Sequence, residues 1–201
     1  MDQENIVYIG LGCDCAVAHN LRKIYSDSLA YPFDWIKCDK INMLCDTLDN
    51  KFSNFFDDFI DDFIELKQSD NFMNFDENID ENIDENIHKK IISNIKIKLK
   101  NGIILPHEAI FDKFDFEKYK EKYTRRIERF YNVCIDKKIK KIFIRADNKK
   151  ITEEDKTKLR ISLDNYGCVN YDIQFINYSD YPIIGEFNWK REYIDWKNII
   201  Y

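Results

Sequence analysis

Short runs of apolar residues alternate along the chain with longer segments in which apolar residues recur every three or four positions. Short runs bounded by turn residues are typical of buried strands, and the longer spacing is typical of amphipathic helices. The pattern predicts strands at residues 5–10, 103–105, 141–148 and 171–176, and helices at residues 14–25, 39–51, 116–136 and 152–166. Strands that alternate with helices favour an α/β fold with a mostly parallel sheet flanked by helices.

An acidic tract interrupts this alternation. Residues 76–87 repeat the sequence Asp-Glu-Asn-Ile without a break. Charge at this density keeps the tract in water, either as a helix or as disordered chain, and we favour a simple-sequence surface insertion over a binding element. A chain of 201 residues suits one domain. We therefore predict a single α/β domain, residues 1–201, with an acidic helical or disordered insertion at about 53–98.

Charge and cysteine content narrow the function classes. The net charge of −6 argues against nucleic acid as a partner, and no stretch approaches the roughly 20 apolar residues of a membrane helix. The acidic first residues do not resemble a signal peptide, so we expect six reduced thiols and a cytoplasmic protein, in the host cytoplasm or the virion if the source is viral. The cysteine spacing is not typical of a structural zinc site, and we predict no metal and no cofactor.

The first predicted strand leads through Gly10 and Gly12 into a helix that begins near Cys15. Unpaired N–H groups and the helix dipole at such a position favour an anion, so a thiol there tends towards the thiolate, which is the nucleophilic form. Cys15 is the candidate nucleophile, with Cys13 two residues earlier as the alternative reactive thiol. A buried, space-filling cysteine is the other interpretation. A dinucleotide site is not indicated, because the turn lacks a third glycine.

Three further polar residues are candidates for chemistry. His107 follows one predicted strand and Asp147 ends another, and sites in parallel sheets form at the carboxyl ends of strands. Asp34 lies in the turn Pro32-Phe33-Asp34-Trp35, where it serves as a local cap of the core, as the group that orients a histidine, or as the group that holds a substrate amine. Arg145, inside the strand that Asp147 ends, is a candidate for binding substrate.

Several of these residues carry a resemblance. Leu11-Gly12-x-x-Cys15-x-x-Ala18-x-x-Leu21-Arg22, then Pro32-Phe33-Asp34-Trp35, then the isolated His107 resemble a family of unknown function named for papain-like cysteine peptidases, met in bacteria and large DNA viruses. The motifs are specific at residues 9–36 and suggestive around His107 and Arg145. Cys13 and Glu108 depart from the family pattern. The resemblance implies that Cys15 is the nucleophile and His107 its base, and it matches Asp34 to the family's aspartate.

The predicted chemistry is thiol-dependent acyl transfer on an amide or thioester carbonyl. Cys15 attacks, His107 moves the proton, and backbone N–H groups from Gly12 to Ala16 hold the oxyanion. The expected partner is a small-molecule or peptide acyl donor. The third catalytic member is open among Asp34, Glu108, Asp112, Asp147 and Asn148, and the candidate substrate-binding residues are Gly12, Cys13, Asp14, Trp35 and Arg145.

Three alternatives to this hydrolase hypothesis remain open. An acyltransferase would pass the acyl group to an amine, such as that of an amino sugar, in place of water. A sugar- or nucleotide-phosphate transferase would use the glycine turn and Arg145 to hold phosphate, with Cys15 structural. A noncatalytic interaction module would use the acidic repeat and the Trp-rich tail to bind another protein.

Overall fold

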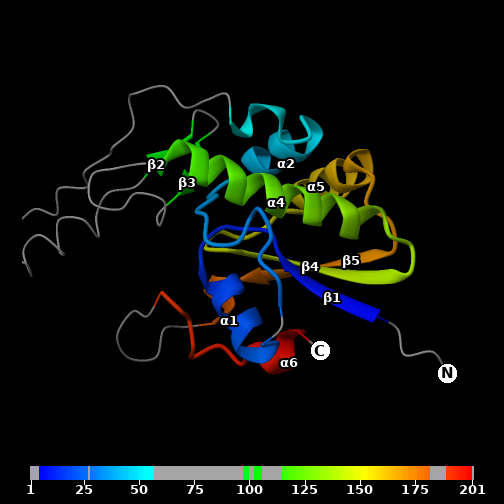
Figure 1. Ribbon diagram of the computed structural model, residues 1–201. Coiled ribbons are helices and arrows are strands. Elements are labelled where there is room, and N and C mark those ends of the chain that lie inside the picture. The colour runs from blue at the N-terminus through cyan, green and yellow to red at the C-terminus, as the bar shows by residue number, and fades with distance from the viewer. Residues whose placement is uncertain are drawn as a thin grey trace, which may run out of the picture.

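A parallel sheet lies between two layers of helices in the computed structural model, which describes residues 5–26, 28–56, 97–99, 102–105, 115–181 and 189–200 (Figure 1). The sheet contains β1 (Asn5–Gly10), β4 (Ile139–Asp147) and β5 (Tyr171–Asn177) in the order β1-β4-β5, and both strand pairs are parallel. This arrangement confirms the predicted α/β class. The tract at residues 76–87 lies outside the described residues, so the insertion and the domain boundaries stay predictions.

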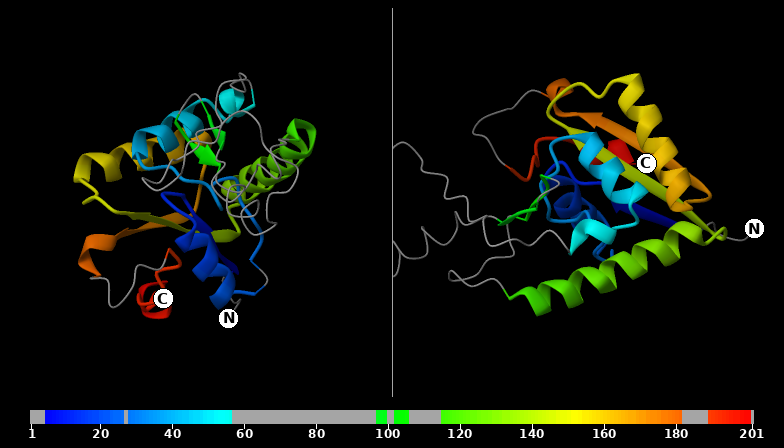
Figure 2. Two further views of the ribbon diagram at one scale, coloured as in Figure 1. Left: turned by 90° about the vertical axis from the view of Figure 1, so that its left-hand side faces the viewer. Right: turned by 90° about the horizontal axis from the view of Figure 1, so that it is seen from above.

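The helices are divided between the two faces of the sheet (Figures 1 and 2). One face is covered by α1 (Ala16–Ile24) and α6 (Trp196–Ile200), and the other by α2 (Ile41–Asp49), α4 (Phe116–Ile135) and α5 (Glu153–Tyr166). Short 3-10 turns follow α2 and β5, as η1 (Ser53–Phe55) and η2 (Tyr178–Asp180). Strand β4 is buried on both faces, because Phe143 packs against the α4 side and Ile144 against the α1 side.

Local sequence signals explain where two of the helices begin and end. The Thr152 hydroxyl accepts the Asp155 N–H at 3.1 Å and the Asp155 carboxylate accepts the Thr152 N–H at 3.2 Å, which forms a capping box at the start of α5. The helix ends at Gly167, whose φ of 101° is the left-handed conformation that glycine adopts without strain. At α4 the Asp115 carboxylate accepts the Lys118 N–H at 3.1 Å.

The strand predicted at residues 103–105 is not part of the parallel sheet. Strand β3 (Ile104–Leu105) pairs antiparallel with β2 (Ile97–Lys98) in a separate two-stranded ribbon. The reason is the tight turn before it, in which Gly102 has a φ of 89° and donates its N–H to the Leu99 carbonyl at 2.8 Å. The ribbon is joined to the domain at Lys37, whose N–H and carbonyl both bond with Ile104, at 2.8 and 2.9 Å.

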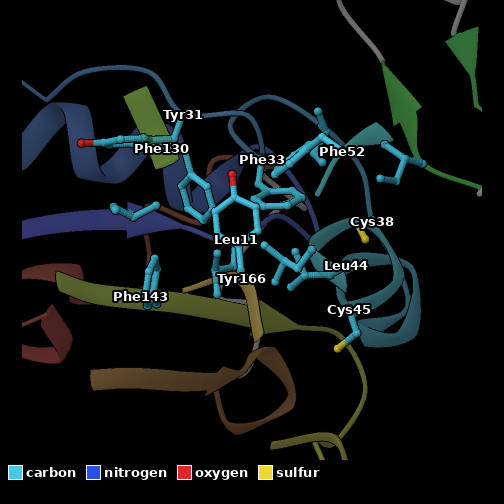
Figure 3. Close-up of a cluster of buried hydrophobic side chains, with 14 of the residues drawn as sticks. Leu11, Tyr31, Phe33, Cys38, Leu44, Cys45, Phe52, Phe130, Phe143 and Tyr166 are labelled. Atoms are coloured by element: carbon cyan, nitrogen blue, oxygen red, sulfur yellow. The ribbon is translucent and has the colours of Figure 1, made fainter. Parts of the chain in front are cut away.

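The larger core lies between the sheet and the layer formed by α2, α4 and α5, and it contains a cluster of aromatic side chains (Figure 3). Phe130 of α4 is at its centre and is 0% exposed. Its ring centroid lies 5.8 Å from that of Phe33, 5.3 Å from that of Tyr166 and 6.1 Å from that of Phe143. The turn that contains Phe33 is therefore fixed from within the core, which positions the neighbouring Asp34.

Replacing Phe130 with alanine should lower the free energy of unfolding by about 3–5 kcal/mol, because it removes a fully buried ring from a close-packed cluster. Tyr131→Ala is the matched control, since the neighbouring ring is 48% exposed, and it should cost about 1 kcal/mol or less. Urea unfolding followed by circular dichroism measures both values. Equal losses for the two variants would contradict this description of the core.

Candidate functional site

The turn that follows β1 has an unusual backbone. The Leu11 N–H continues the sheet by donating to the Ile144 carbonyl at 2.9 Å, and Gly12 and Cys13 then take positive φ angles of 71° and 84°. A positive φ is uncommon for any residue with a side chain, and residues held in such conformations cluster at functional sites. The Cys13 carbonyl accepts the Cys38 N–H at 3.1 Å, which ties the turn to the segment before α2.

Arg145 lies beneath this turn with its side chain 0% exposed. Its Nη1 donates to the Leu11 carbonyl at 3.0 Å, and its Nη2 donates to the Cys38 carbonyl at 2.8 Å and to the Asp147 carboxylate at 2.7 Å. The guanidinium therefore joins three chain segments and uses protein acceptors to do so. The Arg145 side chain is closed to solvent and the Asp147 side chain is only 10% exposed, which favours structural support of the turn over the predicted roles in substrate binding and catalysis.

Cys15 comes directly before α1 as its N-cap residue, so the helix starts one position later than the predicted first turn. All six cysteines lie in the described ranges, and Cys15 alone is half-buried, whereas the other five are buried. Cys13 is 1% exposed, and its thiol is surrounded by Arg145, Asp147 and the Asn148 N–H. Of the two thiols at the turn, Cys15 is the one that a solute reaches.

The electrostatics of Cys15 correct the thiolate expectation. Burial, followed by the charges of Asp14 and Asp34, raises the pKa of the Cys15 thiol to about 12. Burial also raises the pKa of the Cys13 thiol to about 12, although the Arg145 charge opposes that shift. These two effects exceed the attraction of a helix N-terminus for an anion, so the described surroundings keep Cys15 protonated at neutral pH. Nucleophilic attack by Cys15 requires a base.

Asp14 fixes the entrance of α1 through a network that reaches the C-terminal tail. One of its carboxylate oxygens accepts the Ala16 N–H and the Tyr178 hydroxyl, both at 2.9 Å, and the other accepts Nε of Arg191 at 3.4 Å. The Arg191 guanidinium lies 3.6 Å from the centre of the Tyr178 ring and donates to the Asn148 side chain at 2.7 Å. Side chains that follow β1, β4 and β5 thus meet one arginine of the tail.

Asp34 and Trp35 lie in the turn next to Cys15. The Asp34 carboxylate is buried, accepts the Tyr31 N–H at 2.9 Å and passes so close to Gly10 that a Cβ there would lie 3.2 Å from it. Burial raises the pKa of Asp34 to about 6, against the Tyr31 hydrogen bond and the charges of nearby arginines. Trp35 has a positive φ of 64°, and the Arg22 guanidinium stacks on its ring at 4.9 Å.

The structure therefore gathers part of the predicted site. Cys15, Gly12, Cys13 and Asp14 form one turn, and Asp34 approaches it closely enough to act on the Cys15 thiol. His107, Glu108 and Asp112 lie outside the described residues, so their roles stay predictions. The sequence did not identify Tyr178 or Arg191 as residues of the site. The only signal for them was their position, because Tyr178 follows a predicted strand and Arg191 is a charged residue of the aromatic tail.

A cavity of about 230 Å³ opens beside the carboxyl end of β4. It is lined by Asp147, Lys149, Lys150 and the residues that begin α2. Cys15 does not line it, so the cavity and the thiol are separate features of the same sheet edge.

In the described part of the chain no three His, Cys, Asp or Glu side chains are placed to hold a metal ion. None of the described helices has the length and apolar character needed to cross a membrane.

Together these features define an α/β protein whose accessible thiol stands at a helix entrance beside the carboxyl edge of a parallel sheet. The chain belongs to the family described as "Putative papain-like cysteine peptidase (DUF1796)", whose model matches residues 6–180. It is also similar to "Uncharacterized protein R408" of Acanthamoeba polyphaga mimivirus, with 29% identity over 225 aligned positions that cover 96% of this chain and 96% of the relative. No solved structure matches the chain.

Asp14→Asn should lower the pKa of the Cys15 thiol, because it removes a negative charge that disfavours the thiolate. The asparagine oxygen still accepts the Ala16 N–H, so the helix entrance is preserved. Arg191→Met should shift the pKa upward, since Asp14 loses the cation that opposes its charge. The pH at which Cys15 is half-alkylated by iodoacetamide, followed by mass spectrometry, measures both shifts.

Asp172→Asn serves as the control for these two variants, because Asp172 lies on β5 and its carboxylate is mostly exposed. It should leave the alkylation profile of Cys15 unchanged. Shifts of the same sign for Asp14→Asn and Arg191→Met would contradict the electrostatic account of the network.

Asp34 should make stability depend on pH in a defined direction. Its folded pKa of about 6 lies above the ordinary value of 3.8, so the folded state binds the proton more tightly than the unfolded chain does. The benefit is complete below about pH 4 and is lost as the pH rises through 6, by up to about 3 kcal/mol. Asp34→Asn keeps an acceptor for the Tyr31 N–H and should flatten this dependence in urea unfolding between pH 4 and 7. An unchanged slope in the variant would show that Asp34 is not its source.

Proposed function

We propose that the protein is a thiol-dependent acyl-transfer enzyme in which Cys15 is the nucleophile and His107 the general base. The observation that carries the proposal is the exposure of Cys15, since it alone among six cysteines is not buried. Family membership supports the same residue, because the family is named for cysteine peptidases.

The raised pKa of Cys15 gives the base a defined task. A thiol whose pKa is about 12 carries almost no thiolate at neutral pH, and the thiolate is the form that attacks. His107 would accept the proton as the Cys15 sulfur bonds to the acyl carbon, and it would return that proton to the departing amine or thiol. The resulting thioester is then cleaved by water or by an amine, which regenerates the thiol. Attack by water makes the enzyme a peptidase or amidase, and attack by an amine makes it an acyltransferase.

Backbone N–H groups of the turn would stabilise the oxyanion that forms on the acyl oxygen. Within the described residues no hydrogen bond uses the N–H groups of Gly12, Cys13 or Asp14, whereas the Ala16 N–H is taken by the Asp14 carboxylate. The proposed donors are therefore the N–H groups that precede Cys15, and Ala16 leaves the set suggested by the sequence. Preorganised donors of this kind typically contribute about a hundredfold or more to the rate.

The phosphate-transferase alternative is not favoured by the contacts of Arg145. The turn and Arg145 would have to present donors to a phosphate. The guanidinium is fully buried and donates to the Leu11 and Cys38 carbonyls and to Asp147. Acyl transfer at Cys15 uses the thiol that the same contacts leave accessible.

Alkylation tests the proposed pair. In the parent protein, iodoacetamide should label Cys15 selectively, with half-labelling near or below pH 8.5, the ordinary thiol value, because His107 supplies the base that the described surroundings lack. His107→Ala should move half-labelling upward by at least about one pH unit. Mass spectrometry of peptides assigns the label to Cys15 or Cys13.

Two variants control this experiment. Cys13→Ala should leave the labelling profile unchanged, and Cys15→Ser should abolish labelling of the folded protein. A Cys15 thiol that reacts only above pH 10 in both the parent and His107→Ala would refute the activated pair. Formation of a thioester with p-nitrophenyl acetate, seen as an intact-mass increase that Cys15→Ser abolishes, would extend the result from reactivity to acyl transfer.

A further inference from the structure

Three arginines surround the segment that connects α1 to α2. Arg22 comes from α1 on one face of the sheet, and Arg126 and Arg129 come from α4 on the other face. The connecting segment passes between these two helices beside β1 (Figure 1). Arg126 and Arg129 are three residues apart on α4, so their side chains lie on the same side of the helix.

Direct contacts place two of the three guanidinium groups on this segment. Nη1 of Arg129 donates to the Ala30 carbonyl, and the Arg22 guanidinium lies over the Trp35 ring at 4.9 Å. The Arg126 guanidinium lies 5.1 Å from the centre of the Tyr123 ring. All three residues are half-buried.

The cluster has more positive charge than the described residues neutralise. In the described ranges none of the three arginines forms an ion pair. The carboxylate on which all three act is Asp34, which is buried and bonded to the Tyr31 N–H. Three guanidinium charges opposite one carboxylate leave an excess of two.

Arg126 supplies a second and independent indication of a ligand. Its Nη1 is buried, and no hydrogen-bond partner for it is found among the residues that the structure describes. A buried polar group without a partner costs about 1–3 kcal/mol, and a charged group costs more, so unpaired donors of this kind are rare in folded proteins. An oxyanion at this position would satisfy the donor and the excess charge together.

We propose that Arg22, Arg126 and Arg129 form a binding site for a phosphate group. The planar, multiply donating guanidinium matches the geometry of an oxyanion, and a phosphate dianion has the charge that balances the excess of two. A carboxylate, with a single negative charge, would neutralise only half of this excess positive charge. The site lies on the connecting segment and not at the thiol, so it goes beyond the proposed acyl transfer and does not depend on that proposal.

Titration calorimetry with inorganic phosphate at pH 7 tests the site, with sodium chloride used to keep the ionic strength constant. The parent protein should bind phosphate with one-to-one stoichiometry, and Arg126→Gln should weaken binding about tenfold or more. Arg125→Gln is the matched control, because it removes the same charge from the neighbouring, exposed position of α4 and should leave binding within about twofold. Arg22→Gln tests the site from the other helix and should also weaken binding about tenfold.

Several outcomes would overturn the proposal. Equal weakening by Arg125→Gln and Arg126→Gln would mean that phosphate responds only to the general charge of α4. Equal affinity for acetate would mean a carboxylate site, and no binding to the parent would mean no site. Arg126→Lys keeps the positive charge but loses the planar donor geometry of the guanidinium. Circular dichroism checks that this variant is folded, so that weaker phosphate binding is assigned to the lost donor geometry and not to misfolding. Cys15→Ala should bind phosphate as the parent does, so a failure of the proposed nucleophile leaves this result intact.

Discussion

The buried guanidinium of Arg145 is the interaction on which the carboxyl edge of the sheet depends. A charge that is 0% exposed is expensive to desolvate, and it is tolerated only where hydrogen bonds and an opposite charge replace water. Asp147 supplies the charge, and the carbonyls of Leu11 and Cys38 supply the further acceptors. Because each acceptor belongs to a different segment, the requirement to satisfy one side chain fixes the turn after β1, the segment before α2 and the end of β4 together.

A second arginine stabilises the same edge from outside. Arg191 contacts Asp14, Asn148 and the face of the Tyr178 ring, and its own carbonyl accepts the Trp196 indole N–H at 2.9 Å. The aromatic tail therefore does more than cover apolar surface, because its packing delivers a cation to the entrance of α1. Cys15 is placed between the two arginine networks, with the strained turn on one side and the Asp14 cap on the other.

The sequence predicted the elements well because their signals are local. Periodicity located β1, β4, β5 and the four longer helices to within two residues. The contacts of the site were not predictable in this way. Asp14 meets Tyr178 and Arg191 across more than 160 residues of sequence, and no spacing rule connects positions so distant. The position at a helix entrance predicted a lowered pKa for Cys15, whereas burial and the charges of Asp14 and Asp34, which depend on tertiary structure, raise it.

Asp34 connects the two proposed sites physically. Its charge raises the pKa of Cys15, and the same carboxylate is the anion that faces Arg22, Arg126 and Arg129. An anion bound to those arginines would compete with the Asp34 charge and favour its protonation, since its pKa of about 6 is already close to neutral. Protonation of Asp34 would remove one of the two carboxylate charges that hold Cys15 in the thiol form. The turn Pro32-Phe33-Asp34-Trp35 therefore does more than cap the core, because it places one carboxylate between a thiol and a cluster of cations.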